Sequence, residues 1–336
     1  MLARVAQTLY WIARDLERAE SFARLLEVGQ AAALEGDSSN GAGGRLVWEP
    51  LVEIAGDMDS FLATHRRADE RSVPWFLTFG RDNPDSIVAC LNRARENARS
   101  VRDRLPTEVW EGINDSWLDL IEWPPERITR DGVYPFCQGI RRSSYLILGL
   151  VEQTMRRDEG WQFMRLGRFL ERAERSARLV QASQSAQART SLDEDVLDLH
   201  GWRALLGDAS AHEAYLQVDA SALSPESISR FLMLDPRFPR SVAFCLGEVE
   251  SAIGDLVAMD AMAPNPAPLV LARTARDMVE AAARKPWGGP EVGDFIERLL
   301  ARCTSIDLAL GESCFLAAYE RTPIGQHAQA SRQAQN

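Results

Sequence analysis

The stretch ARDLERAESFARLL, residues 13–26, returns almost unchanged as GRFLERAERSARLV, residues 167–180. Across residues 14–25, nine of 12 positions are identical to those found 154 residues later. Apolar residues recur in both copies with the period of about 3.6 residues that an amphipathic α-helix requires. The chain is therefore predicted to carry two equivalent helices, each with the same Glu-Arg pair.

Further matches keep nearly the same spacing. Trp48 matches Trp202 at the offset of 154, and PDSIVACL, residues 84–91, matches PRSVAFCL, residues 239–246, at an offset of 155. Chance similarity between amphipathic helices would not preserve both the order and the spacing of such matches. We interpret them as an internal duplication whose unit has the size of a domain, not of a solenoid repeat.

The duplication predicts two similar helical halves packed around a pseudo-two-fold axis. Helical repeat one would span residues 1–154, and helical repeat two would span residues 155–324. The last residues, 325–336, are polar and contain no aromatic side chain. That composition is typical of a disordered tail.

Nearly the whole chain carries a helical apolar period, and alternating strand patterns are almost absent. The sequence therefore predicts an all-α fold, a multi-helix bundle. The long helices are expected at 2–33, 45–66, 84–104, 107–122, 132–154, 158–186, 238–262, 265–284 and 291–319, and shorter ones at 193–206, 210–220 and 225–234.

Composition narrows the functional classes. The formal net charge of -11 argues against nucleic acid as a partner, and no apolar run is long enough for a membrane span. Lys285 is the only lysine, so a phosphate-binding P-loop is excluded. The five cysteines form no CxxC pair, which is typical of reduced thiols in a cytoplasmic protein. The sequence predicts no metal site and no cofactor.

The repeated phrase places charges on the side of each helix opposite its apolar stripe. In the first copy, Leu9, Ile12 and Leu16 belong to the apolar side, and Arg14 and Glu17 lie across from them. Solvent-exposed charges usually drift between duplicated copies, yet these match. The resulting candidate binding or motif residues are Arg14, Glu17, Arg18, Arg168, Glu171 and Arg172.

Three interpretations of this Glu-Arg face stay open at the level of sequence. The face would be buried between the two halves, where Arg14, Glu17 and Arg18 meet their counterparts in a bidentate network. Alternatively, it would line a cleft that holds a phosphate or carboxylate. In the third interpretation it is an ordinary solvated face with weak ion pairs along each helix.

The chain resembles a known family in these motifs. MLARVAQTLYWIARDLERAESFARLL at the start and GWQFMRLGRFLERAERSARLV at 160–180 are similar to the alpha-E domain family, which is named for its Glu-Arg motif. Residues 84–114 and 235–246 resemble later blocks of that family. The resemblance implies an all-helical fold and carries over Glu17, Arg18, Glu171 and Arg172 as motif residues, without a catalytic role.

The resemblance also implies a setting. Family members commonly occur beside, or fused to, a circularly permuted ATP-grasp ligase, with a transglutaminase-like protein nearby. We therefore expect an accessory or substrate-handling component of an ATP-grasp-linked peptide or amide modification system. Two alternatives remain. One is an amide-forming or transferase enzyme with Glu17 or Glu171 as general base, and the other is a non-catalytic scaffold or dimer module, which leaves a homo-oligomer open.

Overall fold

A computed structural model describes residues 1–35, 43–56, 58–189, 204–218, 223–262, 265–289 and 291–316. Its described residues contain helices and connecting turns and no strand, so the protein is all-α. The predicted tail at 325–336, Trp202 and most of the expected helix at 193–206 lie outside the described residues.

The helices of the first part of the chain follow the sequence pattern closely. Their bounds are α1 Ala3–Glu35, α2 Gly43–Ala55, α3 Met58–Thr64, α4 Ser72–Thr78, α5 Ile87–Ser100, η1 Arg102–Arg104, α6 Thr107–Ile121, α7 Glu126–Asp131 and α8 Tyr134–Thr154.

The later helices continue the same architecture. They are α9 Glu159–Arg189, α11 His212–Val218, α12 Pro225–Leu234, α13 Val242–Ala258, α14 Ala267–Ala283 and α15 Glu291–Leu310, followed by the π-helical turn η2 Gly311–Leu316.

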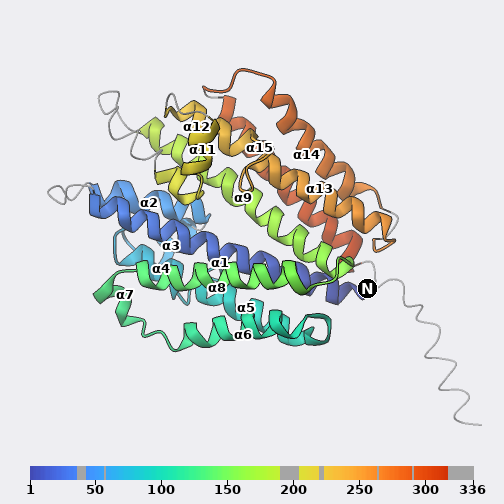
Figure 1. Ribbon diagram of the computed structural model, residues 1–336. Helices are drawn as coiled ribbons and strands as arrows, with labels where there is room; N and C mark the ends of the chain where they lie inside the picture. The colour runs from blue at the N-terminus through green and yellow to red at the C-terminus, as the bar shows by residue number, and fades with distance from the viewer. Residues whose placement is uncertain are drawn as a thin grey trace, which may run out of the picture.

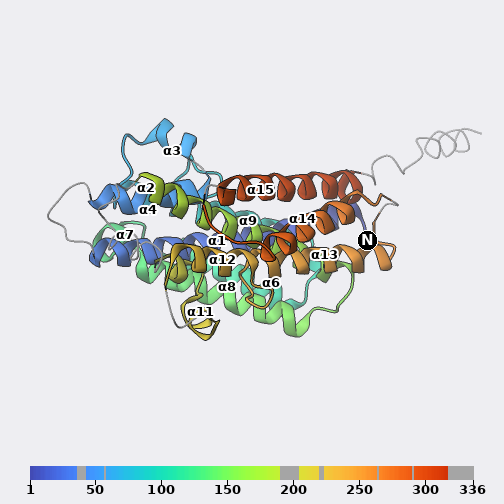
Figure 2. The ribbon, with the colours of Figure 1, turned by 90° about the horizontal axis from the view of Figure 1, so that it is seen from above.

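Two long helices form the centre of the bundle. α1 and α9 pack against each other along much of their lengths and run in the same direction (Figure 1). α5 and α8 cover α1, with α6 outside them, whereas α13 and α15 cover α9, with α14 outside them (Figures 1 and 2). Because neighbours surround both central helices, each of them is buried on nearly all sides.

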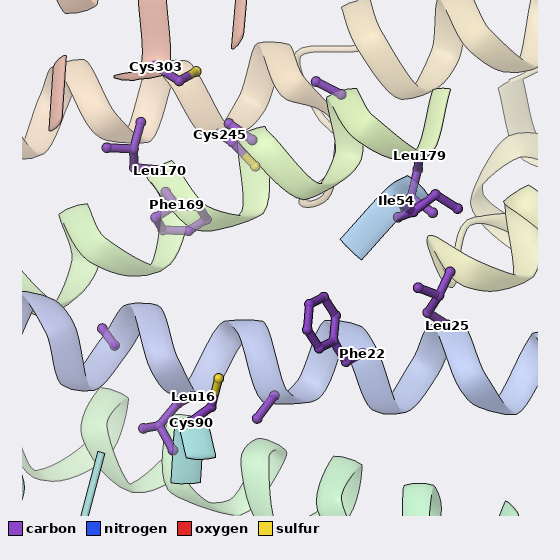
Figure 3. Packing of buried hydrophobic residues seen from close by; sticks show 14 of the residues in the cluster. Leu16, Phe22, Leu25, Ile54, Cys90, Phe169, Leu170, Leu179, Cys245 and Cys303 are labelled. Atoms are coloured by element: carbon purple, nitrogen blue, oxygen red, sulfur yellow. The ribbon is translucent and has the colours of Figure 1, made fainter. Parts of the chain in front are cut away.

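The core runs continuously through the contact between α1 and α9. Phe22 of α1 and Phe169 of α9 belong to one apolar cluster with Leu16, Cys90 and Cys245 (Figure 3). Gly167 allows the two helices to approach closely, because a Cβ at this position would clash with the backbone carbonyl oxygen of Tyr10. The apolar stripe predicted for α1 is confirmed, because Leu9, Ile12 and Leu16 are buried.

Some expected boundaries are wrong. The helix expected at 45–66 is two helices, because α2 ends before Gly56, whose φ of 84° favours glycine. No helix was expected at α4 or α7, which are short, with 7 and 6 residues. The start of α4 is fixed by the Asp69 carboxylate, which accepts hydrogen bonds from the backbone N–H groups of Arg71 and Ser72.

Candidate functional site

The charged phrase lies in the interior of the bundle. Every residue from Ile12 to Glu20 is buried, so the polar side of α1 is as enclosed as its apolar side. The matching residues Glu171 and Arg172 of α9 are buried as well. The interpretation of this surface as a solvated face is therefore wrong, because α9 covers the charges of α1.

The two Glu-Arg pairs bind each other reciprocally. Arg172 donates from Nε and Nη2 to the two carboxylate oxygens of Glu17, both at 2.7 Å. Arg18 makes the same fork to Glu171, at 2.7 Å from Nε and 2.9 Å from Nη2. Forked pairs between a guanidinium and a carboxylate combine two charge-assisted hydrogen bonds with a fixed geometry.

Additional arginines complete the shell of each carboxylate. Glu171 also accepts from Nε of Arg14 at 2.8 Å and from Nε of Arg175 at 2.9 Å. Glu17 accepts a further hydrogen bond from Arg240 at 3.2 Å. Each buried glutamate is thus held by more than one arginine, which compensates the cost of removing its charge from water.

These contacts set the protonation of the two glutamates. Burial alone would raise the pKa of Glu17, but the charges of Arg172 and Arg240 and the hydrogen bonds from Arg172 lower it to about 2. The pKa of Glu171 lies well below its ordinary value because Arg14, Arg18 and Arg175 outweigh the effect of burial. Both side chains are therefore ionised at neutral pH, and Glu17 accepts three hydrogen bonds and Glu171 four from arginines.

One predicted member does not join this network. Arg168 was expected to meet the first copy, but its Nη1 instead donates to Glu152 of α8 at 3.3 Å. Arg168 lies one helical turn before Arg172 on α9, but its guanidinium group is bonded to α8 and, among the described residues, not to α1. The counterpart in the first copy, Arg14, contacts Glu171, Glu174, Asp307 and Tyr10.

A cleft of about 590 Å³ opens on the outer side of the network. Its floor is one side of α9, and α8, α13 and the turn before α13 form its walls. Asp158 starts α9 by accepting from the N–H of Gly160, and Ser241 caps α13 by accepting from the N–H of Phe244. Four arginines line the cleft: Arg165, Arg168, Arg172 and Arg240.

Arg172 and Arg240 connect the buried network to the cleft. Both side chains line the cleft, and both donate hydrogen bonds to Glu17, which is buried and does not line the cleft. Ser176 donates to the backbone carbonyl of Arg240 at 2.7 Å, which ties the turn before α13 to α9. The buried glutamate therefore fixes two cleft arginines in position.

The other lining residues supply apolar surface and some acid. Tyr145, Trp161, Phe169 and Phe244 are the aromatic residues, and Glu152 and Glu248 are the carboxylates. The Arg168 guanidinium lies over the Phe169 ring, with 4.4 Å between the Cζ atom and the ring centroid. Such stacking restricts the arginine while leaving its edge free to donate.

Positive charge is in excess around the cleft arginines. Burial and the charge of Arg172 lower the pKa of Arg168, and the same two causes lower the pKa of Arg240 to about 10. Burial would raise the pKa of Tyr145, but the hydrogen bond from Arg141 and nearby arginine charges lower it overall. An anion in the cleft would therefore be stabilised electrostatically.

Sequence reasoning found Arg168 and Arg172 but missed the other cleft residues. Trp161 and Arg165 precede Arg168 on α9 with helical spacing, so they share its face. That spacing was a usable signal. Tyr145, Arg240 and Phe244 come from other elements, and nothing in the sequence indicates that these elements meet at α9.

Other candidate chemistry is less favoured. Within the described ranges, no three His, Cys, Asp or Glu side chains gather as metal ligands would. All five cysteines are buried free thiols, and burial raises the pKa of each. None of the described helices has a stretch long and apolar enough to cross a bilayer.

Comparison with known proteins identifies relatives and a family of helical domains. Uncharacterized proteins of Mycobacterium bovis and of Mycobacterium tuberculosis strain CDC 1551 are each 26% identical over 267 residues, which is 75% of this chain and 30% of each relative. The chain thus corresponds to about a third of the length of these curated relatives. No solved structure matches. The model of the Alpha-E family, described as "a predicted alpha-helical domain with a conserved ER motif", matches residues 1–315, so the chain belongs to the Alpha-E family.

Proposed function

We propose that this protein is a substrate-handling component of an ATP-grasp-linked peptide or amide modification system. In this role, the cleft over α9 holds an anionic substrate for a separate ligase. The observation that carries the proposal is the position of Arg172 and Arg240, which line the cleft and are braced from behind by Glu17. An arginine side chain that is already held in place loses little further conformational entropy when it binds an anion.

The partner follows from the family setting. As the family resemblance implies, members commonly occur beside, or fused to, a circularly permuted ATP-grasp ligase, with a transglutaminase-like protein nearby. The similar mycobacterial proteins extend well beyond the shared region, which is 30% of their length. This supports a domain that works beside further domains or proteins. We also propose a cytoplasmic location, which five buried, unpaired thiols support.

The reciprocal pairs favour the internal duplication. Glu17 with Arg172 and Arg18 with Glu171 are the same contact made in both directions, as an isologous interface requires. We therefore propose that residues 1–154 and 155–324 are duplicated halves that meet at the Glu-Arg helices. The matched serine caps, Ser86 of α5 and Ser241 of α13, are further support.

The enzyme alternative is less favoured. A general base must be able to accept a proton near neutral pH. Glu17 has its pKa lowered to about 2, and Glu171 is enclosed by three arginines. Neither side chain lines the cleft. A pure scaffold is also less favoured, because it has no need of a cleft lined by four arginines.

The test is a reconstituted reaction with the neighbouring ATP-grasp ligase. Formation of amide product with ATP is measured with and without this protein, together with co-purification of the two proteins. Leu148→Trp narrows the cleft and is expected to lower product formation at least tenfold while leaving co-purification intact. Leu146→Trp places the same side chain on the same helix at a 59% exposed site outside the cleft. Equal activity of both variants, or no dependence on this protein, would contradict the proposal.

A further inference from the structure

Equivalent arginines of the two Glu-Arg phrases are satisfied to very different degrees. Arg14 donates to Glu171, Tyr10, Asp307 and Glu174 at 2.7–3.1 Å. Arg168 stands at the matching position, 154 residues later, and makes one hydrogen bond of 3.3 Å to Glu152 among the residues that the structure describes. Arg168 in the second copy thus keeps the charge of Arg14 but has fewer hydrogen-bond acceptors around it among the described residues.

The missing hydrogen bonds of Arg168 are on one edge of its guanidinium group. Arg168 donates through Nη1, whereas its Nε is buried and finds no acceptor within the described part of the chain. Nε and Nη2 form the two-pronged edge that Arg18 and Arg172 both use to hold a carboxylate. A buried donor without an acceptor is costly, and native structures retain few of them.

Arg168 also lies where a ligand could reach it. It lines the cleft, and 16% of its side chain is exposed. Arg172 and Arg240 stand beside it, and both are engaged with Glu17. Of these three cations, Arg168 therefore has the most unused donor capacity.

The surroundings select among anions. Glu152 and Glu248 also line the cleft, so a ligand with several negative charges would be repelled at close range. A single carboxylate meets less of that repulsion and matches the Nε and Nη2 donor edge of Arg168. The rings of Trp161, Phe169 and Phe244 offer an apolar surface next to it, and the cleft has a volume typical of ligand sites.

We propose that Arg168 receives the carboxylate of a short peptide whose apolar side chain lies on the aromatic wall of the cleft. The inference rests on the proposed function, since it assigns a substrate class to the same cleft. A carboxylate is also the reactant that an ATP-dependent amide-forming ligase must activate. Arg168 is a binding residue in this proposal, and Glu152 is the internal competitor that holds it in the free protein.

Calorimetric titration of the full chain at pH 7.5 and low salt tests this assignment. The probes are N-acetyl-Phe-Ala with a free carboxylate, the same dipeptide as its carboxamide, and ATP. The acid is expected to bind at least tenfold more tightly than the carboxamide and than ATP, because only the acid offers a single carboxylate beside an apolar side chain. Equal binding of acid and carboxamide, tighter binding of ATP, or no saturable binding of the acid would overturn the inference.

Variants locate the site. Arg168→Gln is expected to weaken binding of the acid tenfold or more, and Arg168→Lys is expected to weaken it less because the charge remains without the fork. Arg142→Gln, an exposed arginine of α8 outside the cleft, is the matched control. Thermal melts confirm that each variant is folded. Unchanged affinity in Arg168→Gln would overturn the assignment.

Glu152→Gln supplies a test with the opposite sign. Glutamine keeps an amide oxygen that accepts, but it removes the negative charge that holds Arg168 and repels an anion in the cleft, so the acid peptide is expected to bind severalfold more tightly. A purely structural role of the pair predicts no gain in affinity. Because these titrations need no ligase, they separate the two proposals: peptide binding without co-purification would contradict the proposed partner alone, and co-purification without peptide binding would contradict the carboxylate site alone.

Discussion

Replacement of Glu171 by glutamine tests whether the Glu-Arg network is a structural element of the bundle. The carboxylate accepts four hydrogen bonds of 2.7–2.9 Å, from Arg14, Arg18 and Arg175. Glutamine has nearly the same shape, but its amide NH₂ would face arginine N–H groups, and no negative charge would remain between the three guanidinium groups.

The expected loss follows from the cost of breaking a buried ion pair. Removing one partner of such a pair typically costs about 3–5 kcal/mol of unfolding free energy. For a chain of this size, 1 kcal/mol corresponds to about 1.5 °C in melting temperature, so Glu171→Gln should melt about 4–8 °C lower than the unmodified protein.

Thermal melting followed by circular dichroism at pH 7.5 is the assay. Glu96→Gln is the matched control, because Glu96 pairs with Arg95 and Arg99 on a surface where 41% of its side chain is exposed. Exposed pairs contribute about 0–1 kcal/mol, so this control should melt within about 2 °C of the unmodified protein. A Glu171→Gln variant that melts no lower than the control would refute the reasoning.

Three further predictions concern the same bundle. First, the pKa of Glu17 is lowered to about 2 from an unfolded value near 4.5, so its contribution to stability is complete above pH 4.5 and is lost as the pH falls toward 2; acid melts of Glu17→Gln should show a flatter dependence over that range. Second, burial raises the pKa of Asp208, whose Oδ1 has no acceptor or donor partner among the described residues, so stability falls as the pH rises through that pKa, and Asp208→Asn should raise the melting temperature at pH 8 but not at pH 4. Third, Gly167→Ala should lower the unfolding free energy by about 1–3 kcal/mol in urea titrations because its methyl group would meet the Tyr10 carbonyl, whereas Gly149→Ala on α8, with no neighbour within 4 Å, should raise it by up to about 1 kcal/mol.

Helix positions were largely predictable because amphipathic period and capping are local properties. The expected helix at 225–234 is confirmed to the residue, with Ser224 as its cap and Pro225 at its first position. The expected helix at 107–122 differs from α6 by one residue. The prediction failed at the break after α2, where a single glycine with positive φ interrupts an otherwise continuous pattern.

The site was predictable only in part, because the sequence does not show which helices pack against one another. The repeated phrase correctly drew attention to Glu17, Arg18, Glu171 and Arg172, which form the buried network. A helical wheel of one helix cannot distinguish a charged side that faces solvent from one that faces another helix, because it contains no information about neighbouring elements. Arg240 joins the network from the turn before α13, and Pro239 in that turn is 67 residues after its hydrogen-bond partner Arg172.

The wide sequence separation of the ion pairs has a consequence for synthesis on the ribosome. Glu17 leaves the exit tunnel 155 residues before Arg172, its forked partner. Until α9 emerges, α1 exposes charges that only the second part of the chain can neutralise in a dry interior, so α1 cannot complete its packing early. We therefore expect α1 to become fully buried only late in translation. A nascent chain stalled before residue 172 should stay accessible to chaperones.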